Sequence, residues 1–214
     1  MHRKNTLKSI GKTLMIKKCI FIILILQGCA YASKDIYIIV KNQISGFSTS
    51  SVDVEDINNS KYSFMLVKLG RGPEIKMILN SYKDGLYEWI SAEGERIFTF
   101  NGLIVKTENL EHNIDIKEFN KFSFSKNKQS FKINFDNPEL VNADISYHIK
   151  QADKSRDSNV YGLLDGYVLT KQMSSIGWRF SDKYWVSSEG EVVESSQRFH
   201  PFYQTIHYRI FLKY

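Results

Sequence analysis

Short apolar runs separated by regularly spaced glycine turns are the feature that most limits how this 214-residue chain can fold. Gly85, Gly94 and Gly102 lie eight or nine residues apart, and the runs between them are rich in β-branched and aromatic residues. Asn101-Gly102 is typical of a two-residue hairpin, because a type I′ turn requires positive φ angles. The pattern predicts an antiparallel meander over residues 61–110.

The remainder of the chain continues the β pattern. Apolar and polar side chains alternate around Phe131, Ile133 and Phe135, and they alternate again through the last residues, from Ile206 to Tyr214. Alternation with a period of two is typical of strands that bury one face. We therefore expect a mainly β protein with little helix, built either as an antiparallel β-sandwich or as barrel-like sheets.

An internal repeat suggests how the strands are organised. The segment WISAEGE at residues 89–95 recurs as WVSSEGE at residues 185–191, which begins 96 residues later. This period is too long for a solenoid unit of about 20–50 residues. We expect two related β subdomains, a first meander at 61–110 and a second β region at 111–214 that contains the repeat. Two similar hairpins in one sandwich are the alternative.

The first 28 residues have the properties of a signal peptide. Lys17-Lys18 precede an eight-residue apolar run at 19–26, far shorter than the roughly 20 residues of a membrane-spanning helix. Leu26-Gln27-Gly28-Cys29 then resembles a bacterial lipobox, which implies cleavage after Gly28 and lipidation of Cys29. Residues 29–60 would form the lipidated N-terminus and a tether that leads into the first strand.

Two alternatives concern this N-terminal segment. Ala30-Tyr31-Ala32 resembles an ordinary secretory cleavage site, which would discard Cys29 with the signal. Met15 is a second possible start, and either start leaves the rest of the interpretation unchanged. We favour the lipoprotein. In the bacterial lipoproteins that this lipobox resembles, an Asp directly after the lipidated Cys is the retention signal, and residue 30 is Ala. The resemblance therefore implies the outer membrane, with the body facing the periplasm.

The charge distribution excludes one class of function. The chain has 29 basic and 23 acidic residues, a net charge of +6, but residues 1–28 contain six basic residues and no acid. The mature chain is therefore neutral, with 23 charges of each sign, and does not have the basic surface expected for nucleic-acid binding. It also has at most one Cys, because Cys19 lies in the removed segment, so it has no internal disulfide.

Few residues suggest catalysis or ligand binding. The pairs Glu93/Glu95 and Glu189/Glu191 flank turn glycines, where carboxylates are usually solvated and do not form a glycosidase pair. Trp89 and Trp185 are suited either to packing in a β core or to stacking on sugar rings. The five histidines are scattered without a metal-ligand spacing, and no nucleophile or nucleotide-binding motif is present. We expect no catalytic residues, no metal and no cofactor apart from the covalent lipid.

Several segments together resemble the YjbF/GfcB family of exopolysaccharide and group 4 capsule lipoproteins. They are MLVKLGRGPE (65–74), WISAEGER (89–96), NGLIVKT (101–107) and YWVSSEGEVVESSQ (184–197). The resemblance implies no catalytic site. The positions that match the family motifs are Gly70, Gly72, Gly94, Gly102, Gly190 and Gln197. The resemblance also implies an antiparallel β fold and a role in making or exporting a surface polysaccharide. The expected partners are export proteins of the same gene cluster and, through the lipid anchor, the lipid of the outer membrane.

Three hypotheses for the function follow, in order of preference. The first is a non-enzymatic accessory lipoprotein of polysaccharide assembly or export. The second is a carbohydrate-binding module that stacks sugars on Trp89 and Trp185. The third is a polysaccharide-modifying enzyme that uses Glu93 or Glu189.

Overall fold

The computed structural model describes residues 57 and 59–213, and these belong to one compact unit that begins at Ser48. The expected signal peptide, the lipobox with Cys29 and almost all of the tether lie outside the described residues. No helix in the described part has the length and apolar character needed to cross a membrane.

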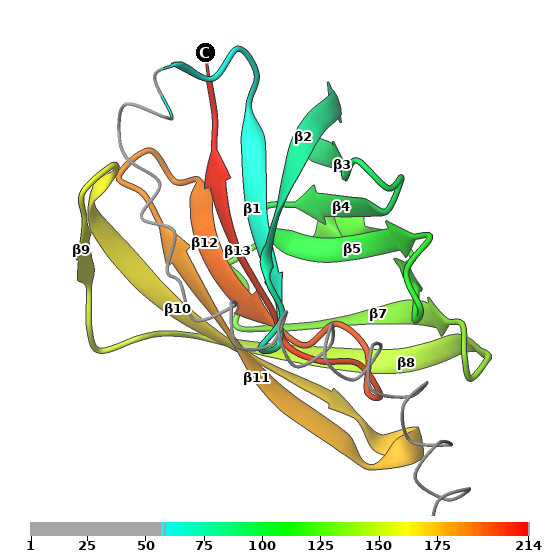
Figure 1. Cartoon of the computed structure of the whole chain (residues 1–214). Helices are drawn as coiled ribbons and strands as arrows, with labels where there is room; N and C mark the ends of the chain where they lie inside the picture. The colour runs from blue at the N-terminus through cyan, green and yellow to red at the C-terminus, as the bar shows by residue number, and fades with distance from the viewer. Residues whose placement is uncertain (1–56, 58, 214) are drawn as a thin grey trace, which may run out of the picture. The chain divides into compact units, whose positions relative to one another are not determined.

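The described part consists almost entirely of strands joined by short turns (Figure 1). Two short 3-10 helices, η1 (Phe119–Lys121) and η2 (Ser174–Ile176), interrupt the strands. The strands are β1 (Phe64–Leu69), β2 (Glu74–Lys83), β3 (Leu86–Ile90), β4 (Arg96–Phe100), β5 (Leu103–Glu108), β6 (Ile114–Ile116), β7 (Lys128–Phe135), β8 (Leu140–Gln151), β9 (Arg156–Ser158), β10 (Gly162–Met173), β11 (Trp178–Val186), β12 (Val192–Gln197) and β13 (Ile206–Phe211).

The strands form one antiparallel sheet that closes on itself. Its order is β11-β12-β13-β1-β2-β3-β4-β5-β6-β7-β8-β10-β9, and a further pairing of β10 with β11 completes a barrel. The short β9 lies outside this ring of the other twelve strands and pairs only with the first residues of β10. Closure leaves these twelve strands without the unpaired backbone groups of an open edge.

This architecture decides between the two expected folds and corrects one expectation. The antiparallel barrel is confirmed, whereas the regions 61–110 and 111–214 are not separate subdomains. They are joined on one side where Lys106 of β5 pairs with Asp115 of β6, and on the other where β1 pairs along its whole length with β13. The local β pattern is the same in both architectures, so only the way in which the strands pair distinguishes them.

Side chains fill the interior of the barrel. Along β8, the inward residues Ala143, Ile145, Tyr147 and Ile149 are buried, while most residues between them are exposed, as the alternation predicts. Inward residues from every strand except β9 form one continuous core. A second, small cluster lies on the outside of β1 and β13, where Tyr161 packs against a stacked aromatic pair.

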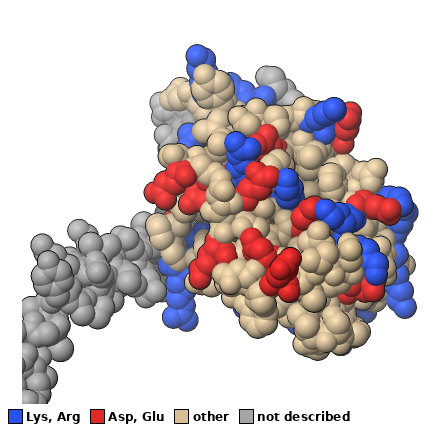
Figure 2. Space-filling view, turned by 90° about the vertical axis from the view of Figure 1, so that its right-hand side faces the viewer, with Lys and Arg blue, Asp and Glu red and all other residues tan. Residues whose placement is uncertain are grey.

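Charged side chains are mixed on the surface. Figure 2 shows Lys and Arg interspersed with Asp and Glu on the side that lies at the right of Figure 1. Several form pairs across neighbouring strands, such as Arg96 with Glu88 at 3.3 Å. No large area of one sign appears in this view, as expected for a body that is neutral overall.

Candidate functional site

The internal repeat forms the same kind of turn twice. Residues 89–95 connect β3 to β4, and residues 185–191 connect β11 to β12. The Ser91 N–H donates to the Glu95 carbonyl at 3.0 Å, and the equivalent bond from Ser187 to Glu191 is 2.8 Å. The glycine has a positive φ in both turns, 89° at Gly94 and 84° at Gly190. The repeat therefore specifies a hairpin connection, and the candidate catalytic residues Glu93 and Glu189 are exposed within it.

The two tryptophans of the repeat lie on opposite sides of the barrel wall. Trp89 is fully buried in the interior, and its indole N–H donates to the Thr99 hydroxyl at 3.0 Å. Trp185 follows the inward Tyr184 on β11, so it faces outward, and the Arg156 guanidinium lies 4.6 Å from its ring centroid. Trp89 thus has no ring face at the surface, whereas Trp185 is partly exposed beside an outer cavity.

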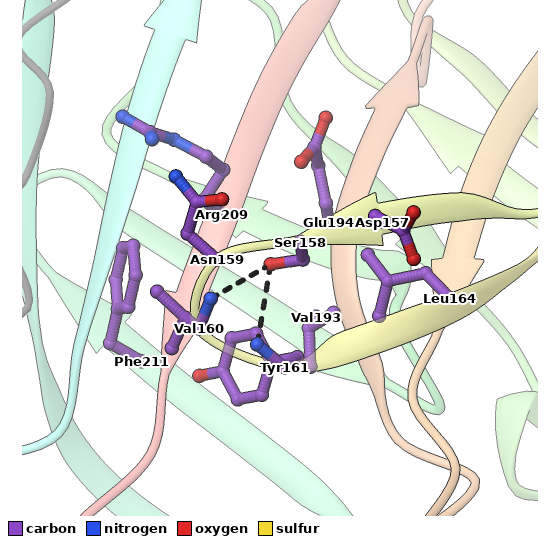
Figure 3. A pocket seen from close by; sticks show the side chains of 10 residues that line it. All are labelled: Asp157, Ser158, Asn159, Val160, Tyr161, Leu164, Val193, Glu194, Arg209 and Phe211. Atoms are coloured by element: carbon purple, nitrogen blue, oxygen red, sulfur yellow. Dashed lines mark hydrogen bonds between the residues drawn. The ribbon is translucent and has the colours of Figure 1, made fainter.

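One outer cavity lies between the β9–β10 hairpin and the outer face of β12 and β13 (Figure 3). It has a volume of about 300 Å³, and its lining combines Asp157, Glu194 and Arg209 with the rings of Tyr161 and Phe211. The hairpin is held over this face, because the Tyr161 hydroxyl donates to the carbonyl of residue 210 at 2.8 Å.

A second outer cavity of about 390 Å³ lies on β10 and β11, under the segment that connects β8 to β9. Trp185 and Arg156 line it, together with two lysines, Lys154 and Lys183. Arg156 also forms a bidentate ion pair with Glu194 of the first cavity, with one N–O distance of 3.1 Å. This ion pair therefore lies where the two cavities adjoin.

The family-motif residues Gly102 and Gln197 meet inside the barrel. The Gln197 side chain donates to the Gly102 carbonyl at 2.7 Å and accepts from the Ile104 N–H at 3.1 Å. The Tyr208 hydroxyl donates to the same carbonyl. Gly102 has φ 73°, and a Cβ there would overlap Val192. These residues therefore fix the β4–β5 turn against β12 and β13.

We expect Gly102→Ala to destabilise the protein much more than Gly94→Ala. Both glycines have positive φ, so both variants carry backbone strain of about 1 kcal/mol. Only residue 102 faces a packed side chain, which should add about 1–3 kcal/mol of overpacking. Urea unfolding of the two variants measures the difference, and equal losses would contradict the contact with Val192.

The other two motif glycines shape the β1–β2 turn. Gly70, with φ 54°, donates its N–H to the Thr205 carbonyl at 2.8 Å, and Gly72 donates to the Leu69 carbonyl at 2.8 Å. The first of these bonds ties the turn to the segment that enters β13. These glycines thus have a structural reason for their positions.

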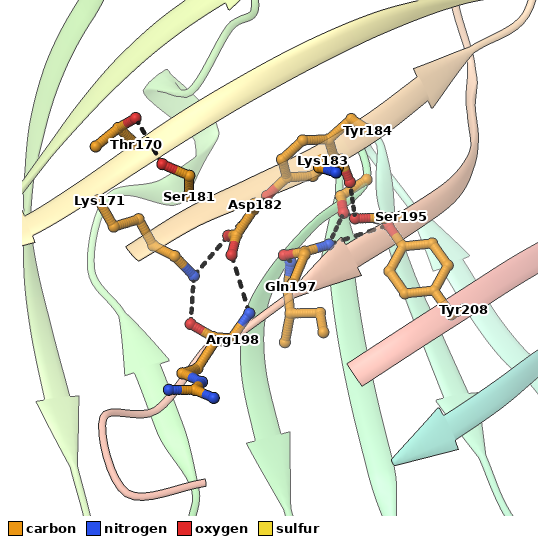
Figure 4. Close-up of polar contacts among 12 residues, drawn as sticks. Thr170, Lys171, Ser181, Asp182, Lys183, Tyr184, Ser195, Gln197, Arg198 and Tyr208 are labelled. Carbon is orange, nitrogen blue, oxygen red and sulfur yellow. Dashed lines mark hydrogen bonds and ion pairs between the residues drawn. The ribbon is translucent and has the colours of Figure 1, made fainter. Parts of the chain in front are cut away.

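A buried ion pair that the sequence analysis did not identify lies at the seam where the barrel closes (Figure 4). Lys171 on β10 and Asp182 on β11 are almost completely buried, and Nζ lies 2.6 Å from the carboxylate. Lys171 also donates to the Arg198 carbonyl at 2.6 Å, and the Arg198 N–H donates to Asp182 at 2.9 Å. Lys171 lies between the inward residues Leu169 and Met173. A charged residue at an inward position of a strand is the sequence signal that could have indicated a buried ion pair.

The electrostatics of this pair indicate a structural role. Burial lowers the pKa of Lys171 and raises the pKa of Asp182, while the attraction between the two charges opposes both shifts. The donors around Asp182 also include the Tyr184 hydroxyl at 3.4 Å. Because these bonds are all made within the barrel, the pair holds β10, β11 and the end of β12 together.

The histidines within the described residues do not form a metal site. No group of three His, Cys, Asp or Glu side chains suited to a metal ion occurs within residues 57 and 59–213. His112 and His200 stack with ring centroids 4.7 Å apart, and each bonds to a backbone carbonyl. Burial lowers the pKa of His200, which favours its neutral form in this aromatic cluster.

The fold and these features define a small closed antiparallel barrel with a filled interior and cavities on its outer face. The chain belongs to the family of group 4 capsule polysaccharide lipoproteins, YjbF and GfcB, whose match covers residues 40–210. The resemblance inferred from the sequence motifs is therefore confirmed.

Individual relatives agree with this assignment. The chain is 23% identical over 205 residues to the uncharacterized lipoprotein YjbF of Escherichia coli strain K12, covering 83% of this chain and 88% of the relative. The crystal structure of the hypothetical lipoprotein YmcC from Escherichia coli K12 has the same fold, with a TM-score of 0.65 and 17% identity over 79% of this chain and 93% of that chain.

Proposed function

We propose that the protein is a lipoprotein anchored in the outer membrane through Cys29, where it acts as a non-enzymatic accessory factor in the assembly or export of a capsular or extracellular polysaccharide. The match of residues 40–210 to a family named for group 4 capsule polysaccharide lipoproteins carries this proposal. The barrel faces the periplasm, and its partners are the export proteins encoded in the same gene cluster.

The distribution of polar groups supports a function on the outside of the barrel. The buried polar side chains are all bonded within the barrel wall. Lys171 and Asp182 pair with each other and with the Arg198 backbone, and Gln197 donates to the Gly102 carbonyl. The core between the walls is packed with apolar and aromatic side chains, so the described interior is filled by the protein itself. The cavity beside the β9–β10 hairpin and the cavity beside Trp185 both lie on the outer face.

The anchor follows from the lipobox. Buried acyl chains contribute about 0.8 kcal/mol per methylene, so the two or three chains of a mature lipoprotein hold it stably at a membrane. The tether of residues 29–60 connects Cys29 to the first strand.

Deleting the gene is expected to reduce the amount or change the length of the surface polysaccharide. The wild-type gene should restore it, whereas Cys29→Ser should lose palmitate labelling and fail to restore it. Cys19→Ala is the matched control, because it removes the other cysteine and keeps the lipobox. Unchanged polysaccharide in the deletion strain would contradict the proposal.

The same assay separates the enzymatic alternative. Glu93→Gln and Glu189→Gln change one exposed turn carboxylate each, so both variants should restore polysaccharide of wild-type length. A change of chain length in either variant would favour an enzyme. The carbohydrate-binding alternative is favoured by a specific observation, the position of Trp185 in the second outer cavity.

A further inference from the structure

The second outer cavity has an aromatic and apolar floor formed by two paired strands. Trp185 of β11 pairs across the sheet with Gly166 of β10, and Lys183 pairs with Val168. The cavity beside the Trp185 ring has a volume of about 390 Å³, and Gly166, Tyr167 and Val168 also line it. This volume lies within the range of small-ligand pockets.

The segment between β8 and β9 forms a fixed wall above this floor. The Ala152 N–H donates to the Gly166 carbonyl at 2.8 Å. A Cβ at residue 166 would lie 3.0 Å from both the Ala152 side chain and the Lys154 carbonyl, so the segment packs closely on the glycine. A wall held in this way is preorganised, which reduces the entropy lost when a ligand binds.

The charged groups of this cavity all have the same sign. Its described lining residues include three cations, Lys154, Arg156 and Lys183, and no Asp or Glu. Arg156 is held by Glu194 and by the face of Trp185. Within the described part of the chain, Lys154 and Lys183 form no ion pair, so their ammonium groups are available to an anion.

We propose that this cavity binds an acidic sugar residue of a polysaccharide chain. The sugar ring lies against Trp185, and its carboxylate pairs with Lys154 and Lys183. An aromatic ring supplies a flat apolar surface for the C–H face of a pyranose. The lysines supply positive charge for a carboxylate, a group that a neutral sugar does not have. The ligand class rests on the proposed function in polysaccharide export, whereas the cavity and its charge come from the structure.

Binding is measured by calorimetry on the full-length protein in neutral detergent, with tetragalacturonate as the acidic probe and maltotetraose as a neutral tetrasaccharide. We expect tetragalacturonate to bind at least about tenfold more tightly than maltotetraose, with the difference decreasing at high salt. Equal affinity for the two probes would overturn the proposal.

Variants locate the site. Lys154→Gln combined with Lys183→Gln should weaken tetragalacturonate binding by about tenfold or more. Trp185→Leu should weaken binding of the same probe and remove the ligand-induced change in tryptophan fluorescence. Lys83→Gln is the matched control, an exposed lysine at the end of β2, and should leave the affinity unchanged. Unchanged affinity in the lysine double variant, with circular dichroism confirming its fold, would overturn the proposal.

Two further outcomes are informative. Tighter binding of inorganic phosphate than of tetragalacturonate would assign the lysines to a phosphate group and overturn the acidic-sugar site. If gene deletion alters the surface polysaccharide but tetragalacturonate does not bind, the proposed function stands and this site is removed. If tetragalacturonate binds with the expected variant effects but deletion changes nothing, the site stands and the proposed function fails.

Discussion

Lys171→Met is expected to lower the free energy of unfolding by about 3–5 kcal/mol. The substitution keeps most of the side-chain volume but leaves the Asp182 carboxylate, which is completely buried, without its cation. A buried charge without a partner is much more costly than a missing neutral hydrogen bond. The Arg198 carbonyl also loses its donor. Urea denaturation followed by circular dichroism measures the loss.

Two comparisons test whether the uncompensated charge causes this loss. Lys132→Met breaks the exposed pair with Asp144 and should change stability by less than about 1 kcal/mol. Adding Asp182→Leu to Lys171→Met removes the stranded carboxylate and should recover part of the stability, because an apolar pair often replaces a buried ion pair at little cost. A Lys171→Met variant as stable as Lys132→Met would show that Asp182 is not buried as described.

Trp89→Ala is expected to destabilise the barrel by about 3–5 kcal/mol. The indole is fully buried, stacks 5.8 Å from Tyr87 and bonds to the Thr99 hydroxyl, so its removal leaves a large cavity and an unpaired buried oxygen. Chemical unfolding of the variant gives the change in free energy.

The matched variant is Trp185→Ala, which changes the same position of the repeated motif. Trp185 lies on the outer face under Arg156, so its loss should cost only about 1 kcal/mol. The Trp185→Ala substitution should instead impair acidic-sugar binding. Trp89 does not line the second outer cavity, so its loss does not remove a contact with the sugar. Similar destabilisation by both substitutions would contradict the opposite orientations of the two rings.

The strands were largely predictable because their signals are local. The Asn101-Gly102 dipeptide supplies the positive φ angles of the β4–β5 turn, and both residues have them in the structure, 47° and 73°. The alternation after Ile206 corresponds to β13, in which Ile206, Tyr208 and Ile210 are buried. The motif WxSxEGE likewise forms a hairpin turn at both occurrences.

The candidate site was less predictable, because it depends on contacts between distant residues. Gln197 and Gly102 were recognised only as family-motif positions, and no local pattern indicates that a hydrogen bond joins them across 95 positions of the chain. Lys171 and Asp182 are eleven residues apart on neighbouring strands, and only the register of β10 against β11 brings their charges together.

The sequence by itself determined the mainly antiparallel β character and the positions of the tight turns, because turn chemistry and side-chain alternation act over a few residues. Its motif segments also indicated the lipoprotein family. The tertiary structure decided that the sheet closes into one barrel and that Trp89 faces inward while Trp185 faces outward. In a strand the side chains alternate between two faces, and which face becomes the interior is fixed only when all strands have paired.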